Sequence, residues 1–152
     1  MERALVVLEA TEKGRELLAE AGTLAEATGA ELILLSVLTE EGFEHDLETL
    51  ETIAEVEHAT YGEDAIEHLL TEFAEQMGDE VLEGRDVHYE VRGVVDDGDR
   101  RIDEILEAVE ERNCDYVFLL SRKRNRVREA LFGDRAQAVV RSFDGYVVVR
   151  RE

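Results

Sequence analysis

Short apolar runs, separated by segments with helical spacing, constrain this chain more than any other feature. Four of the runs read as strands: Ala4–Leu8, Glu31–Leu38, Asp115–Leu120 and Gly145–Val149. Each is too short to be an independent helix, and nearly continuous apolar character is typical of strands that are buried on both faces. A fifth strand is predicted at Val87–Arg92, where apolar and polar residues alternate.

The intervening segments predict helices. Thr11 is a candidate N-cap for the first helix, and Gly29 is a candidate for its end. Further helices are predicted at Tyr61–Val81, Ile102–Val109 and Ala136–Phe143, with a short one near Leu47–Ile53.

Strands and helices therefore alternate along the chain. This order predicts an α/β fold, with a mostly parallel sheet, right-handed crossovers and helices on both faces. Because no repeat, proline or linker-like tract interrupts the pattern, residues 1–152 are expected to form a single domain.

The charge is extreme for a chain of 152 residues. There are 38 acidic residues against 17 lysines and arginines, which gives a formal net charge of −21, and only Lys13 and Lys123 are lysines. Self-repulsion of this size is tolerable where concentrated salt screens it. We therefore expect a salt-loving source, with no nucleic acid and no membrane as a partner.

A cytoplasmic location is expected for two reasons. Met1-Glu2-Arg3 runs directly into an apolar strand without a signal-peptide pattern. The single cysteine, Cys114, cannot form an internal disulfide, and its surroundings are acidic. It is expected to be a small buried apolar residue at the start of a strand.

Basic residues gather late in the chain, five of them between Arg122 and Arg128. Ligands of open parallel sheets bind beyond the carboxyl ends of the strands, where the strand order reverses. The candidate turns are Glu9–Lys13, the region of Val37, and Ser121–Gly133. In the last turn two interpretations stay open. In the first, the turn binds a small anion through Ser121, Arg122, Lys123, Arg124 and Arg126. In the second, its basic side chains are solvated or paired with nearby acids.

Four segments together resemble the universal stress protein family over nearly the whole length: Ala4–Glu12, Glu31–Val37, Ile105–Leu119 and Ser121–Val149. The resemblance implies a five-stranded parallel sheet of order 3-2-1-4-5, the Rossmann-like fold of the adenine nucleotide alpha hydrolases. It also implies a homodimer formed through the last strand, by Tyr146, Val147, Val148 and Val149.

Nucleotide-binding members of that family hold ATP with an acid after the first strand and with glycines after the fourth. The corresponding positions here are Val7, Glu9, Val37, Leu119, Leu120, Lys123, Gly133, Asp134 and Arg135. Glu9 replaces the usual aspartate, Leu120 and Lys123 replace the first two glycines, and Asp134 replaces a serine or threonine. Side chains at the glycine positions keep phosphate away from the backbone, and Asp134 would repel it. We therefore expect weak or absent ATP binding and no cofactor, with ATP and AMP as the candidate ligands.

Three functional hypotheses remain. The first is a homodimeric stress-response regulator without catalytic residues of its own. The second is a sensor of nucleotides or anions, or a slow ATPase, that uses the basic segment 122–128. The third is an adenine-nucleotide enzyme of the alpha hydrolase type, against which the chain has no adenylating phosphate-loop signature. The four histidines, His45, His58, His68 and His88, do not have the spacing of a metal pair.

Overall fold

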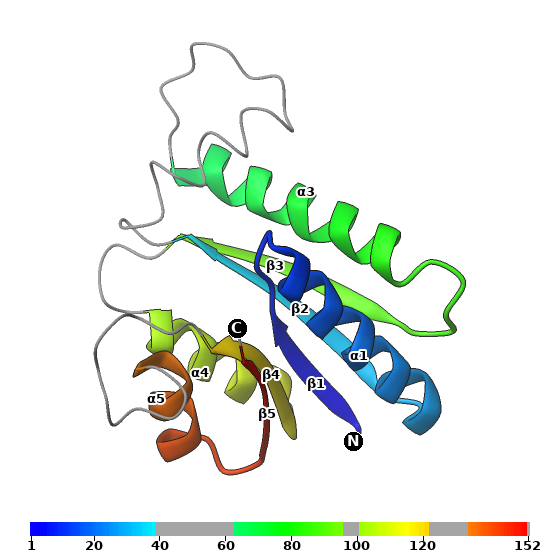
Figure 1. The fold of residues 1–152 in the computed structure, drawn as a ribbon. Helices are drawn as coiled ribbons and strands as arrows, with labels where there is room; N and C mark the ends of the chain where they lie inside the picture. Colours follow the sequence, from blue (N-terminus) through cyan, green and yellow to red (C-terminus); the bar gives the residue numbers. More distant parts are fainter. Residues whose placement is uncertain (39–62, 96–100, 122–133, 152) are drawn as a thin grey trace.

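The computed structural model describes residues 1–38, 63–95, 101–121 and 134–151, and these residues form one five-stranded parallel sheet flanked by helices (Figure 1). The sheet has the order β3-β2-β1-β4-β5, as predicted. In chain order the elements are β1 (Arg3–Val7), α1 (Glu12–Thr28), β2 (Glu31–Leu38), α3 (Glu63–Val81), β3 (Tyr89–Val95), α4 (Arg101–Arg112), β4 (Tyr116–Ser121), α5 (Asp134–Ser142) and β5 (Tyr146–Arg151).

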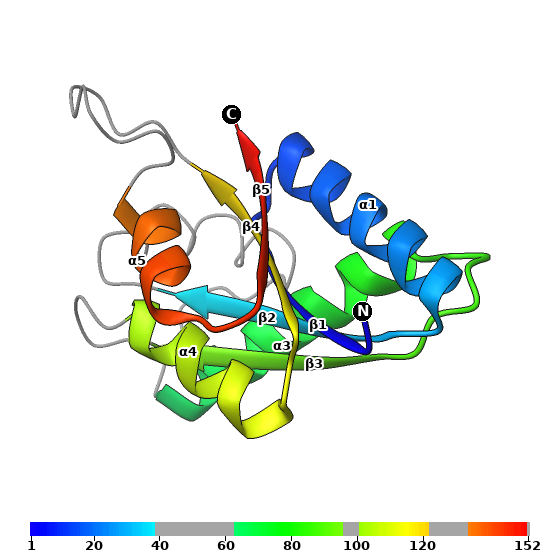
Figure 2. The ribbon, with the colours of Figure 1, turned by 90° about the horizontal axis from the view of Figure 1, so that it is seen from below.

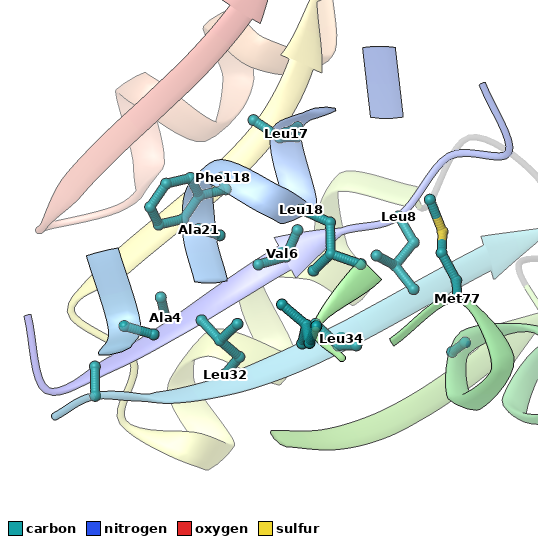
Figure 3. Close-up of a cluster of buried hydrophobic side chains, with 14 of the residues drawn as sticks. Ala4, Val6, Leu8, Leu17, Leu18, Ala21, Leu32, Leu34, Met77 and Phe118 are labelled. Carbon is teal, nitrogen blue, oxygen red and sulfur yellow. The ribbon is translucent and has the colours of Figure 1, made fainter. Parts of the chain in front are cut away.

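Alternating side chains of the central strands enter two separate cores. In β1, Ala4 and Val6 face the core under α1 and α3, whereas Leu5 and Val7 face the core under α4 and α5. All four are at most 1% exposed, which explains why the run is apolar without interruption. Figure 3 shows the first of these cores, with Phe118 of β4 beside α1.

The helices of the described segments divide evenly between the two faces of the sheet. Leu18 of α1 and Met77 of α3 belong to one core, and Ile105 of α4 and Val139 of α5 belong to the other. Figure 2 shows α4 and α5 on the opposite side of the sheet from α1. Within the described part of the chain, no helix is long and apolar enough to span a bilayer.

Both ends of α1 follow the prediction. The Thr11 side chain accepts a hydrogen bond from the Gly14 backbone N–H at 3.0 Å, which satisfies an orphan donor of the first turn. Gly29 ends the helix with φ of 75°, a left-handed conformation that glycine adopts at little cost.

The third strand differs from the prediction: it runs from Tyr89 to Val95 rather than from Val87 to Arg92. Val87 lies in the preceding turn, where its N–H donates to the Arg85 carbonyl. Pairing with β2 begins at Leu32 and Tyr89 and continues to the end of both strands. The helix predicted near residues 47–53 lies outside the described residues.

Asp115 ties together the amino ends of three strands. Its carboxylate accepts hydrogen bonds of 3.0 Å from the backbone N–H groups of Glu2 and Arg3, and its backbone carbonyl accepts one from Tyr146 N–H at 2.9 Å. Burial opposes ionisation of this carboxyl, but the backbone donors outweigh burial and lower its pKa.

Replacing Asp115 by asparagine is expected to lower the free energy of unfolding near neutral pH and to have less effect in acid. Because the native pKa is depressed, the carboxylate contributes its full stability above the unfolded-state pKa of about 3.9, and the contribution is lost as pH falls through the native pKa. Urea unfolding from about pH 6 to about pH 2.5 measures this, with Asp144→Asn, at an exposed position, as the control. A difference from wild type that stays constant with pH would contradict the assignment.

Candidate functional site

The carboxyl ends of β1 and β4 form the site edge of the sheet. The chain leaves β1 toward β2 and β3 on one side and later returns to β4 and β5 on the other, so the strand order reverses between β1 and β4. This is the switch point at which ligands of open parallel sheets bind. The register pairs Val6 with Phe118, so Glu9 is level with Ser121 just beyond the paired segment.

Three polar side chains at this edge are buried. Glu9 follows β1, Ser36 lies near the end of β2 and Ser121 ends β4, and each is 5% exposed. Among the described residues these are the buried polar and charged ones, and all three lie toward the carboxyl ends of adjacent strands. A concentration of buried polar groups at one edge is what a binding site built at a switch point requires.

Ser36 was not predicted as a site residue. It interrupts the apolar run of the second strand, which was the available signal in the sequence. The pairing of β2 with β1 and β3 shows that the position is internal to the sheet, and this could not be read from the run itself.

The turn that carries Glu9 is packed tightly against the first turn of α1. A Cβ atom added to Gly14 would lie 2.2 Å from the Glu9 carbonyl oxygen and 3.1 Å from the Thr11 hydroxyl. No real Cβ tolerates the first distance, so only glycine permits this approach of turn and helix. Gly14, which the sequence did not single out, therefore sets the position of the Glu9 backbone.

Leu120 lies in the core rather than in an open cradle. It is 1% exposed and belongs to the cluster of Leu8, Leu18 and Phe118 beneath α1. The position that the family resemblance assigns to the first glycine is therefore occupied by a packed leucine side chain.

The other apolar residues proposed for the nucleotide site are also core residues. Val7, Val37 and Leu119 belong to the cluster on the α4 and α5 face and are at most 7% exposed. These three side chains are part of the core that lies beneath the site edge.

The remaining predicted site residues lie wholly or in part outside the described residues. Arg122, Lys123, Arg124, Arg126 and Gly133 lie outside the described residues. Asp134 and Arg135 begin α5, but their side chains also lie outside the described part.

At the carboxyl end of β5, Arg150 is level with Leu120 and reaches back to α1. Its Nη2 donates to Glu16 Oε2 at 3.1 Å, across a separation of 134 residues. Both side chains are about half exposed, so this ion pair contributes little to the free energy of folding. It does orient the arginine beside the site edge.

The predicted dimer residues lie on an edge strand. Within the described sheet β5 pairs with β4 alone. Tyr146 is 64% exposed, and Val147, Val148 and Val149 are half-buried. The Tyr146 ring stacks on Tyr116, with ring centroids 4.8 Å apart.

Three groups with displaced pKa values lie at the opposite end of the sheet from the site. Burial raises the pKa of the Cys114 thiol to about 11 just before β4, where Asp115, with its lowered pKa, follows. Burial, a hydrogen bond to Asp79 and the charges of Asp79 and Glu75 raise the pKa of Tyr89 to about 12 at the start of β3. Cys114 is buried just before β4, as predicted. The described residues contain no group of three or more His, Cys, Asp or Glu side chains suited to a metal ion.

Several of the solved structures that this chain resembles are universal stress proteins. The hypothetical protein MJ0577 matches with a TM-score of 0.69 at 18% identity, covering 99% of this chain and 96% of that one. The universal stress protein UspA of Lactobacillus plantarum matches with a TM-score of 0.67 at 15% identity, covering 99% and 97%. A universal stress protein crystallised with cAMP matches with a TM-score of 0.64 at 15% identity, covering 99% and 96%. At these identities the likeness shows the fold.

Family membership comes from the sequence itself. No curated protein matches this chain. The model of the universal stress protein family, however, matches residues 1–151, nearly the full length. The chain belongs to the universal stress protein family.

Proposed function

We propose that this protein is a homodimeric regulator of the stress response that does not bind ATP tightly and has no catalytic residues of its own. The observation that carries the proposal is the burial of Leu120 at the carboxyl end of β4. A glycine at this position would let phosphate oxygens approach the backbone N–H groups, whereas a packed leucine holds a ligand away.

Restoring the family pattern is expected to create ATP affinity. The variant Leu120→Gly/Lys123→Gly/Asp134→Ser removes two side chains and one negative charge from the phosphate position. Removing like-charge repulsion alone is worth about 1 kcal/mol in water and about 4 kcal/mol near a protein surface at 4 Å. ATP should therefore bind at least about fivefold more tightly to the variant than to wild type in calorimetric titrations in molar salt.

Because Leu120→Gly opens the core, the double variant Lys123→Gly/Asp134→Ser is the better-folded companion. It should show part of the gain, and neither protein should release phosphate from ATP. Micromolar binding of ATP by wild type would overturn the proposal, and so would ATP hydrolysis at the edge formed by β1 and β4.

A second candidate function is the sensing of a nucleotide or small anion through side chains. It is favoured by the relative crystallised with cAMP and by the position of Arg150 beside the site edge. In this mode Arg122, Lys123, Arg124 and Arg126 hold the anion. Titration of AMP, cAMP and inorganic phosphate against wild type and a variant with these four residues changed to glutamine separates the two candidates. Binding that disappears in the variant supports the sensor, and its absence from wild type supports the regulator without a nucleotide.

The dimer is proposed through β5 because the two edges of the described sheet differ in character. On the β3 edge, Glu90 and Arg92 form ion pairs with Arg112 and Glu111 of α4. The β5 edge instead carries three consecutive valines, Val147 to Val149. Exposed apolar edges pair with other chains, and charged ones resist it.

The cellular setting is proposed from composition. A net charge of −21 and two lysines favour function in a salty cytoplasm, where the Debye length is about 3 Å at 1 M salt. Screening of this kind would also let two strongly acidic copies approach each other.

A further inference from the structure

We infer that Arg150 is an anion-binding residue of the site edge and that Glu16 competes with the anion for its guanidinium. The anion is a phosphate group, either free or carried by a nucleotide. The inference rests on the second candidate function, the sensing of a nucleotide or small anion. It adds one residue that holds the phosphate and one that lowers the affinity for it.

Arg150 lies on the α1 face of the edge strand β5. Side chains two residues apart in a strand share a face, and two earlier members of this row are placed by their contacts. Tyr146 stacks on Tyr116 with ring centroids 4.8 Å apart, and Val148 packs against the core under α1. Arg150 continues the row near the carboxyl end of the strand, level with Leu120 of β4. Its side chain therefore begins beside the leucine that fills the glycine position.

The contact with Glu16 shows which way the Arg150 side chain extends. Helix α1 packs against β4 and β1, and the carboxyl end of β5 lies beside the first turns of α1 (Figure 2). Arg150 Nη2 donates to Glu16 Oε2 at 3.1 Å. The side chain thus extends from the edge strand toward α1, in the direction of the point where the strand order reverses.

The guanidinium of Arg150 is suited to hold phosphate. It has five N–H donors in a planar fork that matches two phosphate oxygens. The described contacts use two of these donors, one from Nη2 to Glu16 and one from Nη1 to the Arg151 carbonyl at 3.2 Å. Leu120, at 1% exposed, keeps a ligand away from the backbone of β4. A charged side chain must therefore do what backbone N–H groups do in a glycine-lined site.

Glu16 offers Arg150 the same chemistry as the proposed ligand. Carboxylate and phosphate oxygens both accept from the arginine fork, so the two compete for the same donors. The Arg150 and Glu16 side chains are 46% and 52% exposed, and we expect so exposed an ion pair to be formed about twice as often as it is open. Because about a third of the molecules then have a free guanidinium, the apparent affinity for phosphate is about threefold lower than without Glu16.

Removing Glu16 should strengthen phosphate binding, and removing Arg150 should weaken it. Phosphorus NMR titrations of AMP and of inorganic phosphate in molar KCl measure the dissociation constants. We expect a value about threefold lower for Glu16→Gln and at least about fivefold higher for Arg150→Gln than for wild type. The double variant should bind like Arg150→Gln, because Glu16 acts only through the arginine. Comparison of the two ligands shows whether the phosphate is free or carried by a nucleotide.

Glu80→Gln is the matched control. Glu80 pairs with Arg15 of α1 at 3.0 Å, and the two side chains are 50% and 49% exposed, so this substitution removes one negative charge from an ion pair of the same kind. Since the Debye length in molar salt is about 3 Å, phosphate affinity should stay within about 1.5-fold of wild type. An equal gain in Glu80→Gln and Glu16→Gln would reduce the effect to net charge and overturn the inference. A gain that persists when Arg150 is also replaced would overturn it as well.

Two outcomes separate failure of this inference from failure of the sensing function. Phosphate binding that is unchanged in both Glu16→Gln and Arg150→Gln refutes the roles of these two residues and keeps the sensor. Absence of AMP and phosphate binding from every protein at millimolar ligand, Glu16→Gln included, refutes the sensor and the inference together. Circular dichroism establishes that the variants are folded, which we expect because so exposed an ion pair contributes little to folding.

Discussion

Replacing Val148 by aspartate is expected to raise the dissociation constant of the proposed β5 homodimer by about 100-fold. The substitution puts one carboxylate from each copy into the apolar stretch Val147 to Val149 of the edge strand. Charge repulsion is screened in molar salt, where the Debye length is about 3 Å, so the larger effect is the lost burial of two valine side chains. Burial of each valine is worth about 1.5 kcal/mol, and each 1.4 kcal/mol is a factor of ten.

Sedimentation equilibrium in molar KCl measures the change. Val148→Thr is the matched control, since threonine has nearly the same shape and no charge, and it should keep the dimer within about tenfold of wild type. Circular dichroism establishes that both variants are folded. An aspartate variant that remains a dimer at wild-type concentration would exclude Val148 from the centre of the interface.

Replacing Gly14 by alanine is expected to lower the free energy of unfolding by about 3 kcal/mol. The new Cβ would lie 2.2 Å from the Glu9 carbonyl oxygen, so the turn after β1 or the first turn of α1 must move. Overpacking in well-packed regions costs about 1–3 kcal/mol. The upper part of this range applies because the obstacle is backbone, and it exceeds the gain of about 1 kcal/mol that alanine brings to a helix.

Gly22→Ala in the same helix is the matched control. There the Cβ would meet the Leu82 methyl group at 2.5 Å and Arg85 Cδ at 3.3 Å, both of which belong to flexible side chains. Its free energy of unfolding should stay within about 1 kcal/mol of wild type. Equal effects of the two substitutions in urea unfolding would show that the close approach of Glu9 to α1 is not what requires Gly14.

The elements were predictable because their patterns are local. Strands buried on both faces read as continuous apolar runs, and Thr11 and Gly29 mark the ends of α1 through short-range hydrogen bonds and a left-handed backbone. The alternation of strands and helices gave the parallel sheet, and the family resemblance gave its order. The start of the third strand was misplaced by two residues, because its limits follow from pairing with β2 rather than from its own alternation.

The candidate site was predictable in part. Glu9 and Ser121 were found because they follow apolar runs, and both are buried at the edge where the order reverses. Ser36, Gly14 and the Glu16–Arg150 ion pair were not found. Each depends on residues that are brought together by the fold, such as the carbonyl of Glu9 above Gly14 or a glutamate 134 positions away from its arginine.

The sequence by itself determined the periodicities of strands and helices, the acidic surface and the loss of the glycine pattern, because composition and local spacing are properties of the chain. The tertiary structure decided that Leu120 packs into the core beneath α1, that the buried polar groups lie at one edge, and that β5 lies beside β4 at the end of the described sheet. These features depend on which strands are neighbours and in which register. Register is set by the packing of two whole cores against the sheet, and no single segment specifies it.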